Sequence, residues 1–276
     1  MKSLTPYPEL DIVFKEYANI IQKILGSNFV GFYLQGSLVL GDFDLTSDID
    51  FIIVTERDLS EEQLEEVKKA HERIYNHPNR WVKRLEYSFF PKEKLNQFSS
   101  PFSQDKRNDS PDRKLWYFNN GSRTIEKSDH CNTLVTRWTV REKGIAVLGP
   151  SPANLINQID VNELRKEIKN TLVGWGRELF KDSEPYKNRF YQSYLVLNYC
   201  RMLHDLYEGK INSKLAGVKW AKNNLDKSWI PLIDFCWQER QDTSISIKQP
   251  ADPKVFPQSL KFVEYVVKRG EDYEIT

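Results

Sequence analysis

Two aspartates at the start of an apolar segment constrain the fold more than any other feature of the sequence. Asp48 and Asp50 flank Ile49 and are followed at once by FIIV. Side chains alternate between the two faces of a strand, so both carboxylates share one face while Ile49 and Phe51 share the other. Two acids side by side at the border of a core are costly unless a cation lies between them. Carboxylate oxygens suit Mg²⁺, so the pattern predicts a metal-binding strand.

A third carboxylate lies inside another apolar segment. Glu86 occurs in RLEYSFF (84–90), where Leu85 and Tyr87 are expected to face away from it. If this strand pairs beside the strand at 49–54, Glu86 joins the two aspartates. Three carboxylates can hold two metal ions, which bind the attacking and leaving oxygens of an in-line displacement. A carboxylate at such a site could also accept the proton of an attacking hydroxyl.

A Gly-Ser pair follows the apolar segment at 31–35. Gly36 lets the backbone approach a phosphate closely, and exposed N–H groups together with the Ser37 hydroxyl can hold its oxygens. Ser47, directly before the first aspartate, adds another hydroxyl. Each element also has an ordinary interpretation: Gly-Ser as a turn, the aspartates as strand-end acids and Glu86 as a charge at a strand edge. Their combination, in this order, favours the metal-dependent site.

The apolar periodicity changes along the chain and predicts an α+β domain followed by an all-α domain. Helices are expected at 8–25 and 61–77, and strands at 31–35, 49–54 and 84–90, giving a small mixed sheet with flanking helices. The break at GPSP (149–152) divides a catalytic domain, 1–150, from a helical bundle domain, 151–276. The polar segment 97–124 is either a functional lid or a disordered insertion. Further helices are expected at 132–144, 161–181, 188–208, 215–225, 229–240 and 254–268.

Composition excludes several classes of function. Forty Lys and Arg against thirty-nine Asp and Glu give a net charge of +1, which argues against a nucleic-acid partner. No apolar stretch is long enough for a membrane span, and the N-terminus lacks the apolar run of a signal peptide. Three widely spaced cysteines favour neither a disulfide framework nor a zinc ribbon. We therefore expect a soluble, cytoplasmic protein without a membrane partner.

The remaining aromatic and histidine residues offer weaker signals. The four histidines show no metal-ligand spacing, and His71 falls on the apolar face of its predicted helix, as expected for a core residue. Tyr117, like its neighbour Trp116, could stack on a base or a sugar, although such aromatics are more often part of the core.

The segment GSLVLGDFDLTSDID (36–50) resembles the signature of the nucleotidyltransferase superfamily related to DNA polymerase β. Within it, the whole chain is similar to the aminoglycoside adenylyltransferases that modify streptomycin and spectinomycin. That similarity rests on REKGIAVLGP (141–150), CRMLHDLYEGKINSK (200–214) and AGVKWA (216–221). It implies a nucleotidyltransferase domain and an appended helical domain that closes a cleft for ATP and an acceptor.

The resemblance also implies roles for individual residues. Asp48 and Asp50 match the magnesium ligands, and Glu86 matches the third carboxylate, which is both a metal ligand and the catalytic base. Where the family carries an acid near ATP, this chain has Asn132, close to Asp129. The expected ATP-binding residues are Gly36, Ser37, Ser47, Asn132, Arg201 and Lys214, the last two reaching the phosphates from the helical domain.

The family resemblance is weakest at the acceptor. Positions that carry acids for the cationic drug in the streptomycin and spectinomycin enzymes correspond here to Lys187 and Tyr191, and lysine works against binding a polycation. The expected function is transfer of AMP from ATP, with two Mg²⁺ ions, to a hydroxyl of a small molecule, with an aminoglycoside or aminocyclitol favoured, and release of pyrophosphate. A different acceptor (protein, nucleotide or metabolite) and a non-catalytic nucleotide-binding regulator are the alternatives. We expect a monomer.

Overall fold

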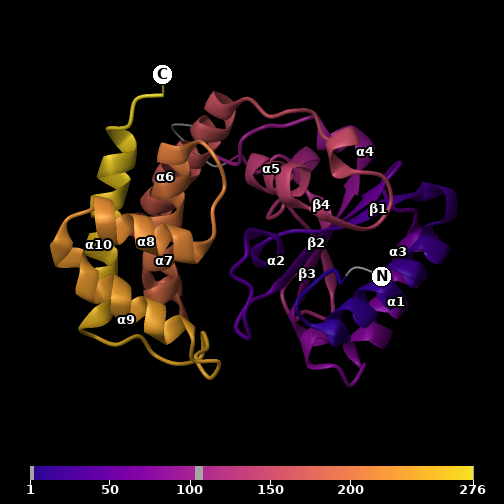
Figure 1. Ribbon diagram of the computed structural model, residues 1–276, viewed down its shortest axis with the longest axis horizontal. Coiled ribbons are helices and arrows are strands. Elements are labelled where there is room, and N and C mark those ends of the chain that lie inside the picture. Colours follow the sequence, from indigo (N-terminus) through magenta and orange to yellow (C-terminus); the bar gives the residue numbers. More distant parts are fainter. Residues whose placement is uncertain (1–2, 103–107, 276) are drawn as a thin grey trace. The chain divides into compact units, whose positions relative to one another are not determined.

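The computed structural model describes residues 3–102 and 108–275, which form two compact units (Figure 1). Unit 1 comprises residues 1–43, 47–99 and 109–158. Unit 2 comprises residues 159–276 together with two short segments, 44–46 and 100–108. The catalytic and helical domains predicted at 1–150 and 151–276 stay a prediction.

Unit 1 is built on a six-stranded mixed sheet with the order β5-β4-β3-β2-β1-β6. β2 and β3 are parallel, and the other neighbouring strands are antiparallel. The predicted α+β class with a small mixed sheet is therefore confirmed. The strands are β1 (Phe29–Leu34), β2 (Ile49–Thr55), β3 (Leu85–Pro91), β4 (Leu115–Phe118), β5 (Ile125–Ser128) and β6 (Ile145–Leu148).

Helices cover both faces of this sheet. α1 and α3 lie together on one face, where Phe51 and Ile53 of β2 are buried (Figure 1). The opposite face buries Ile52 and Val54 against residues that include Val140 of α5. The two faces of β2 thus follow the alternation expected for a strand. The helices of unit 1 are α1 (Pro8–Leu25), α2 (Ser37–Leu40), α3 (Glu61–Tyr75), α4 (Lys92–Leu95) and α5 (Leu134–Lys143).

Local signals in the sequence set the ends of two of these helices. α1 ends at Gly26, whose φ of 54° suits glycine. α3 begins after Ser60, whose side chain accepts a hydrogen bond from the backbone of Gln63 in a complete capping box.

A chain of buried hydrogen bonds runs through the core of unit 1. His71 Nε2 lies 2.8 Å from the Ser122 carbonyl oxygen, which can only accept, so Nε2 carries the proton. His71 Nδ1 therefore accepts from the Tyr87 hydroxyl at 2.8 Å, and Tyr87 accepts in turn from Tyr17. Burial lowers the pKa of His71 and keeps it neutral. The expectation that His71 is a core residue is confirmed.

Three short strands were not expected from the sequence. β4 lies inside the polar segment 97–124, and β5 and β6 follow it. Strands of four residues are too short to show an alternating pattern, and they form because a neighbouring strand pairs with them. The segment is therefore partly sheet; its residues 103–107 lie outside the described residues.

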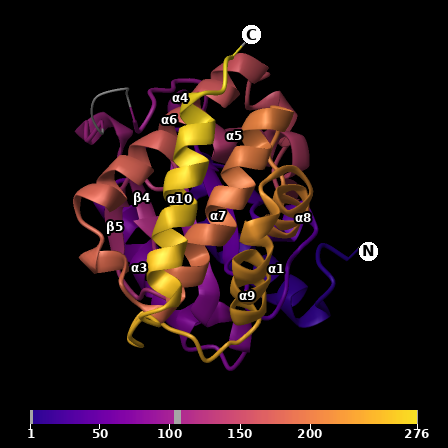
Figure 2. The same ribbon diagram turned by 90° about the vertical axis from the view of Figure 1, so that its left-hand side faces the viewer.

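Unit 2 is an all-α bundle, as expected for the second half of the chain. α7 packs against α6, α8, α9 and α10, and α10 runs alongside α6 and α7 (Figure 2). α7 and α8 approach closely at Gly217, where an added Cβ would lie 2.6 Å from Arg201 Cα. The helices are α6 (Val161–Lys181), α7 (Arg189–Glu208), α8 (Lys214–Asn224), α9 (Ile230–Arg240) and α10 (Val255–Glu271).

The two short segments from the first half of the chain have partners in the bundle. Asp44 forms an ion pair with Arg240 of α9. The ring of Phe102 lies against Gly174 of α6, where a Cβ would come within 2.5 Å of Phe102 Cδ1. Short 3-10 helices complete the two units at Gly26–Asn28, Arg80–Arg84, Pro111–Arg113, Pro152–Asn154, Glu184–Tyr186 and Lys227–Trp229.

None of the helices in the described part of the chain is suited to cross a membrane. Across residues 3–102 and 108–275, every helix is too short or too polar to cross a bilayer.

A buried carboxyl in α7 makes the stability of the bundle depend on pH. Asp205 is 4% exposed and accepts hydrogen bonds from the backbone and side chain of Asn212. Burial raises the pKa of Asp205 from 3.8 to about 7. The protonated Asp205 contributes fully to stability below pH 3.8, where the carboxyl is protonated in both the folded and the unfolded chain. This contribution is lost as the pH rises through about 7, because the carboxyl ionises at lower pH in the unfolded chain than in the folded one.

We expect Asp205→Asn to reduce this pH dependence, since the amide does not ionise. Urea unfolding at pH 5 and pH 8 should show a smaller difference in the free energy of unfolding for Asp205→Asn than for the wild-type chain. The exposed Asp272→Asn serves as the control and should keep the wild-type difference. An equal difference in all three proteins would contradict the assignment.

Candidate active site

The pairing of β2 with β3 brings two of the three predicted carboxylates together. Asp50 and Glu86 are direct partners in this parallel pair, so their side chains lie on the same face of the sheet. Asp48 precedes β2 by one residue and lies two residues before Asp50. The strand pairing on which the predicted cluster depends is present.

The Gly-Ser turn lies directly against Asp50. Gly36 follows β1 with a φ of 65°, and an added Cβ would lie 2.0 Å from Asp50 Oδ2. The Gln35 N–H donates to the Asp50 carbonyl oxygen at 2.9 Å, which holds the turn at this end of β2. Glycine is therefore required at position 36 both by backbone conformation and by space.

Of the two predicted serines, Ser37 follows the turn directly and Ser47 precedes Asp48. Ser37 is the first residue of α2 and is partly exposed. Ser47 is buried next to Asp48, and its carbonyl oxygen lies 3.5 Å from Arg84 Nη1. Their predicted contacts with ATP stay predictions.

Two side chains that the sequence did not single out as site residues contact the carboxylate of Glu86. The Tyr117 hydroxyl donates to Glu86 Oε1 at 2.8 Å, and His130 Nε2 lies 3.2 Å from the same oxygen. Burial raises the pKa of Tyr117, and the nearby charges of Glu86 and Asp50 raise it further. The hydrogen bond to Glu86 raises the pKa of His130. The site therefore extends to β4 and to the loop after β5.

The donor set suits magnesium, but its members have other partners in this arrangement. Asp48 accepts a hydrogen bond from Asn120, while Tyr117 and His130 contact Glu86. Among the residues that the structure describes, no three His, Cys, Asp or Glu are grouped so that they could hold a metal ion. The predicted pair of Mg²⁺ ions stays a prediction that rests on the chemistry of three carboxylates and on the turn at Gly36.

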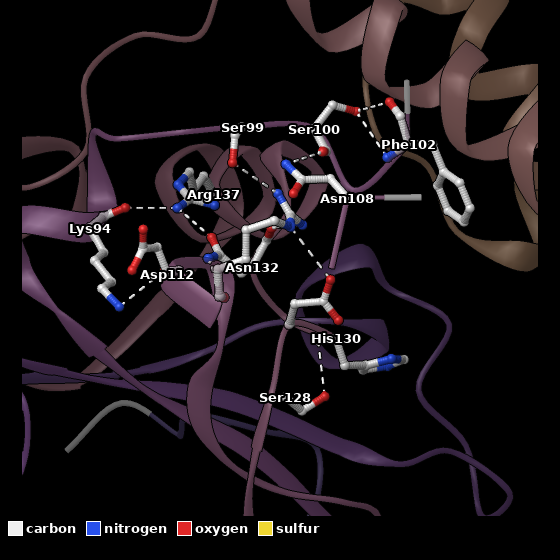
Figure 3. Close-up of polar contacts among 12 residues, drawn as sticks. Lys94, Ser99, Ser100, Phe102, Asn108, Asp112, Ser128, His130, Asn132 and Arg137 are labelled. Carbon is white, nitrogen blue, oxygen red and sulfur yellow. Dashed lines mark hydrogen bonds and ion pairs between the residues drawn. The ribbon is translucent and has the colours of Figure 1, made fainter. Parts of the chain in front are cut away.

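Asn132 has a structural role in the loop that carries His130. It is 6% exposed, its Nδ2 donates to the Arg113 carbonyl oxygen at 2.6 Å, and its Oδ1 accepts from Arg137 Nη2 at 2.7 Å (Figure 3). Both polar groups of the side chain are thus engaged within the protein. The predicted contact of Asn132 with ATP stays a prediction.

Two buried arginines fix this loop to the segment that follows β3. Arg137 donates to the Lys94 carbonyl oxygen at 2.7 Å (Figure 3). It also donates to the carbonyl oxygens of Leu95 at 2.8 Å and Gln97 at 3.2 Å. Arg113 lies 3.4 Å from the Asp129 carboxylate and donates to the Asn132 carbonyl oxygen. Buried guanidinium groups need such a full set of acceptors, so the loop has little freedom.

The two predicted phosphate-binding cations belong to unit 2. Arg201 on α7 donates to Asn198 at 2.9 Å, and Lys214 at the start of α8 lies 5.0 Å from the ring centroid of Tyr194. Close packing of α7 and α8 at Gly217 positions the helix that carries Lys214. Their predicted role at the ATP phosphates stays a prediction.

The positions expected to face the acceptor are not acidic. Lys187 pairs with Glu184 at 3.1 Å. Tyr191 packs edge-on against Tyr186, with ring centroids 5.0 Å apart, and is half-buried.

Both halves of the chain match known families. A family model described as "Nucleotidyltransferase domain" matches residues 15–109, and one described as "Aminoglycoside adenylyltransferase, C-terminal domain" matches residues 154–269. Spectinomycin 9-adenylyltransferase of Staphylococcus aureus is 25% identical over 228 residues, which cover 78% of this chain and 79% of that protein. The protein of the same name from Campylobacter jejuni is 25% identical over 261 residues, covering 92% and 93%.

A solved structure shares the fold over nearly the whole length. Spectinomycin adenyltransferase from Enterococcus faecialis, determined with ATP and spectinomycin, superposes with a TM-score of 0.68 at 15% identity and covers 96% of this chain and 100% of that one. The two family matches and the curated relatives agree with the resemblance carried by the Gly-Ser and Asp-x-Asp segment. The chain is therefore a nucleotidyltransferase, an adenylyltransferase that resembles the aminoglycoside adenylyltransferases.

Proposed function

We propose that the protein transfers AMP from ATP to a hydroxyl of a small molecule, an aminoglycoside or aminocyclitol antibiotic, and releases pyrophosphate. The observation that carries the proposal is the register of β2 and β3, which sets Glu86 beside Asp50 at the Gly36 turn. The curated relatives are named as spectinomycin 9-adenylyltransferases, which supports both the reaction and the class of acceptor.

The reaction needs a base and a means of holding the triphosphate. Glu86 accepts the proton of the acceptor hydroxyl, whose oxygen forms a bond to the α-phosphorus of ATP. The bond from the α-phosphorus to the bridging oxygen breaks, and pyrophosphate leaves with its electron pair. The Gly36 backbone and the hydroxyls of Ser37 and Ser47 bind phosphate oxygens, and Arg201 and Lys214 supply positive charge to the triphosphate.

The carboxylates Asp48, Asp50 and Glu86 would hold Mg²⁺, which would offset the negative charge of the triphosphate and of the leaving pyrophosphate. The hydrogen bond from Asn120 engages Oδ1 of Asp48, and both oxygens of a carboxylate can act as ligands of such an ion.

A second acceptor class is favoured by one observation. Lys187, paired with Glu184, stands where the resemblance to the streptomycin and spectinomycin enzymes implies an acid for a cationic drug. An acceptor with less positive charge, such as a metabolite, a nucleotide or a protein hydroxyl, would avoid repulsion by this lysine. A regulator without catalytic activity is less well supported because all three carboxylates are present.

Transfer to a panel of antibiotics tests the acceptor class. With ATP labelled at the α-phosphate, we expect label on spectinomycin or on another aminoglycoside or aminocyclitol in the panel. Tight ATP binding without transfer to any antibiotic would contradict the antibiotic proposal and direct the search to the second class. Tight ATP binding with no transfer to metabolites or proteins either would favour the regulator.

Removal of the base tests the mechanism. We expect Glu86→Gln to lower kcat by about 10²-fold or more, because a general base contributes about 10² to 10⁴ in rate. ATP should still bind, because Asp48, Asp50 and the Gly36 turn remain. Initial rates of pyrophosphate release and equilibrium ATP binding measure the two effects. Glu126→Gln, an exposed change on β5, should keep wild-type turnover. Turnover of Glu86→Gln near that of the control would rule out Glu86 as the base.

Removal of divalent cations tests the metal. Pyrophosphate release should stop in the presence of excess EDTA and return when Mg²⁺ is added beyond the chelator, because three carboxylates facing a triphosphate need a compensating charge. Far-UV circular dichroism should be the same with and without EDTA. Full activity in metal-free buffer would contradict the proposed metal dependence.

A further inference from the structure

Glu86 lies at the meeting point of two donors that come from different parts of the chain. Tyr117 belongs to β4, within the sheet, and reaches Oε1 at 2.8 Å. His130 belongs to the loop after β5 and reaches the same oxygen at 3.2 Å. The two rings lie 5.5 Å apart between centroids. Two donors on one oxygen restrict the rotation of a carboxylate about its terminal bond.

The loop that presents His130 is held on both sides of the residue. Asp129 pairs with the buried Arg113, and Asn132 contacts both Arg113 and Arg137. The His130 N–H also donates to the Ser128 hydroxyl at 3.2 Å. The contacts of the loop therefore set the place of this imidazole, in addition to its ring contact with Tyr117.

The exposed surface of His130 indicates that this residue belongs to the site and not to the hydrophobic core. Its side chain is 63% exposed, whereas that of Glu86 is 11% exposed. An imidazole with so much exposed surface contributes little buried apolar area, so its removal has little effect on folding. It borders the small exposed part of Glu86, where the hydroxyl of the acceptor must arrive.

We propose that His130 is a positioning residue for adenylyl transfer. With Tyr117, it fixes the direction in which the Glu86 carboxylate faces the acceptor hydroxyl. This inference rests on the proposed function, in which Glu86 is the base. Small errors in the alignment of a reacting group reduce the rate strongly, while binding of ATP to other groups is unaffected.

Two substitutions at one position test the role. His130→Ala should lower kcat by about tenfold or more, because a misplaced catalytic group can lose up to about 10²-fold in rate. The KM for ATP and the melting temperature should stay close to wild type. His130→Gln, whose side-chain amide can donate from nearly the same place as Nε2, should recover most of the lost rate. Unchanged kcat in His130→Ala, or equal losses in both variants, would overturn the proposal.

Ser128→Ala is the matched control for the loop itself. It removes the hydrogen bond to the His130 backbone but keeps the imidazole, the arginine contacts and the Glu86 contact. We expect near-wild-type kcat in this variant. A loss as large as that of His130→Ala would assign the effect to the loop backbone and overturn the role of the side chain.

A second readout does not depend on turnover. Long-range ¹H–¹⁵N spectra of the imidazoles should show a proton on His130 Nε2, and its signals should shift in Glu86→Ala. The signals of His77, two residues after the end of α3, should not shift. Identical His130 signals in both proteins would overturn the contact and the proposal.

The two experiments also separate this proposal from the function on which it rests. If Glu86→Gln turns over as fast as the wild-type protein, Glu86 is not the base, and the proposed role of His130 fails with it, whatever the spectra show. If Glu86→Gln abolishes turnover but His130→Ala leaves it unchanged, only the role of His130 fails.

Discussion

The parallel pairing of β2 and β3 is the constraint on which the site depends. It is the one parallel pair among the strands that the structure describes, and it sets Asp50 opposite Glu86. A shift of one residue would turn Glu86 to the opposite face and bring its neighbours Leu85 and Tyr87 toward Asp50. The register is secured by burial, because Phe51 and Ile53 pack on one face while Ile52 and Val54 pack on the other.

Hydrogen bonds among buried polar groups then shape what surrounds this pair. Arg113 and Arg137 hold the loop of His130, and Tyr117 reaches Glu86 from the next strand of the sheet. Such networks are costly if one member is missing, since a buried charge would lose its partners. The surroundings of Glu86 are therefore held by polar contacts in addition to the apolar cores on the two faces of the sheet.

The long, periodic elements could be predicted from the sequence, and the short ones could not. α1 and α6 have the predicted bounds, because their apolar positions recur over several turns and clear signals mark their ends. β4, β5 and β6 have four residues each and depend on the neighbouring strands for their existence. The alternation of side chains between the two faces could be predicted around Asp50 and Glu86, because both residues lie in strands of seven residues.

The rest of the candidate site depends on contacts between residues far apart in the sequence. Tyr117 and His130 reach Glu86 across 31 and 44 positions, and no local pattern marks a side chain that will meet a carboxylate on another strand. Asn132 shows the same difficulty. The family resemblance implied a nucleotide contact for Asn132, which stays a prediction, and no local pattern indicated that its side chain joins two buried arginines.

The bundle contains two pieces of chain that precede it, 44–46 and 100–108, so the polypeptide passes between the two units more than once. A chimera in which a relative's sequence replaced only the residues after 158 would keep Asp44 and Phe102 but exchange their partners Arg240 and Gly174 for foreign residues. A chain that acquires the helical unit of a relative therefore needs matched changes in the two segments at 44–46 and 100–108, which precede that unit in the sequence. This linkage restricts how such enzymes can diverge by recombination.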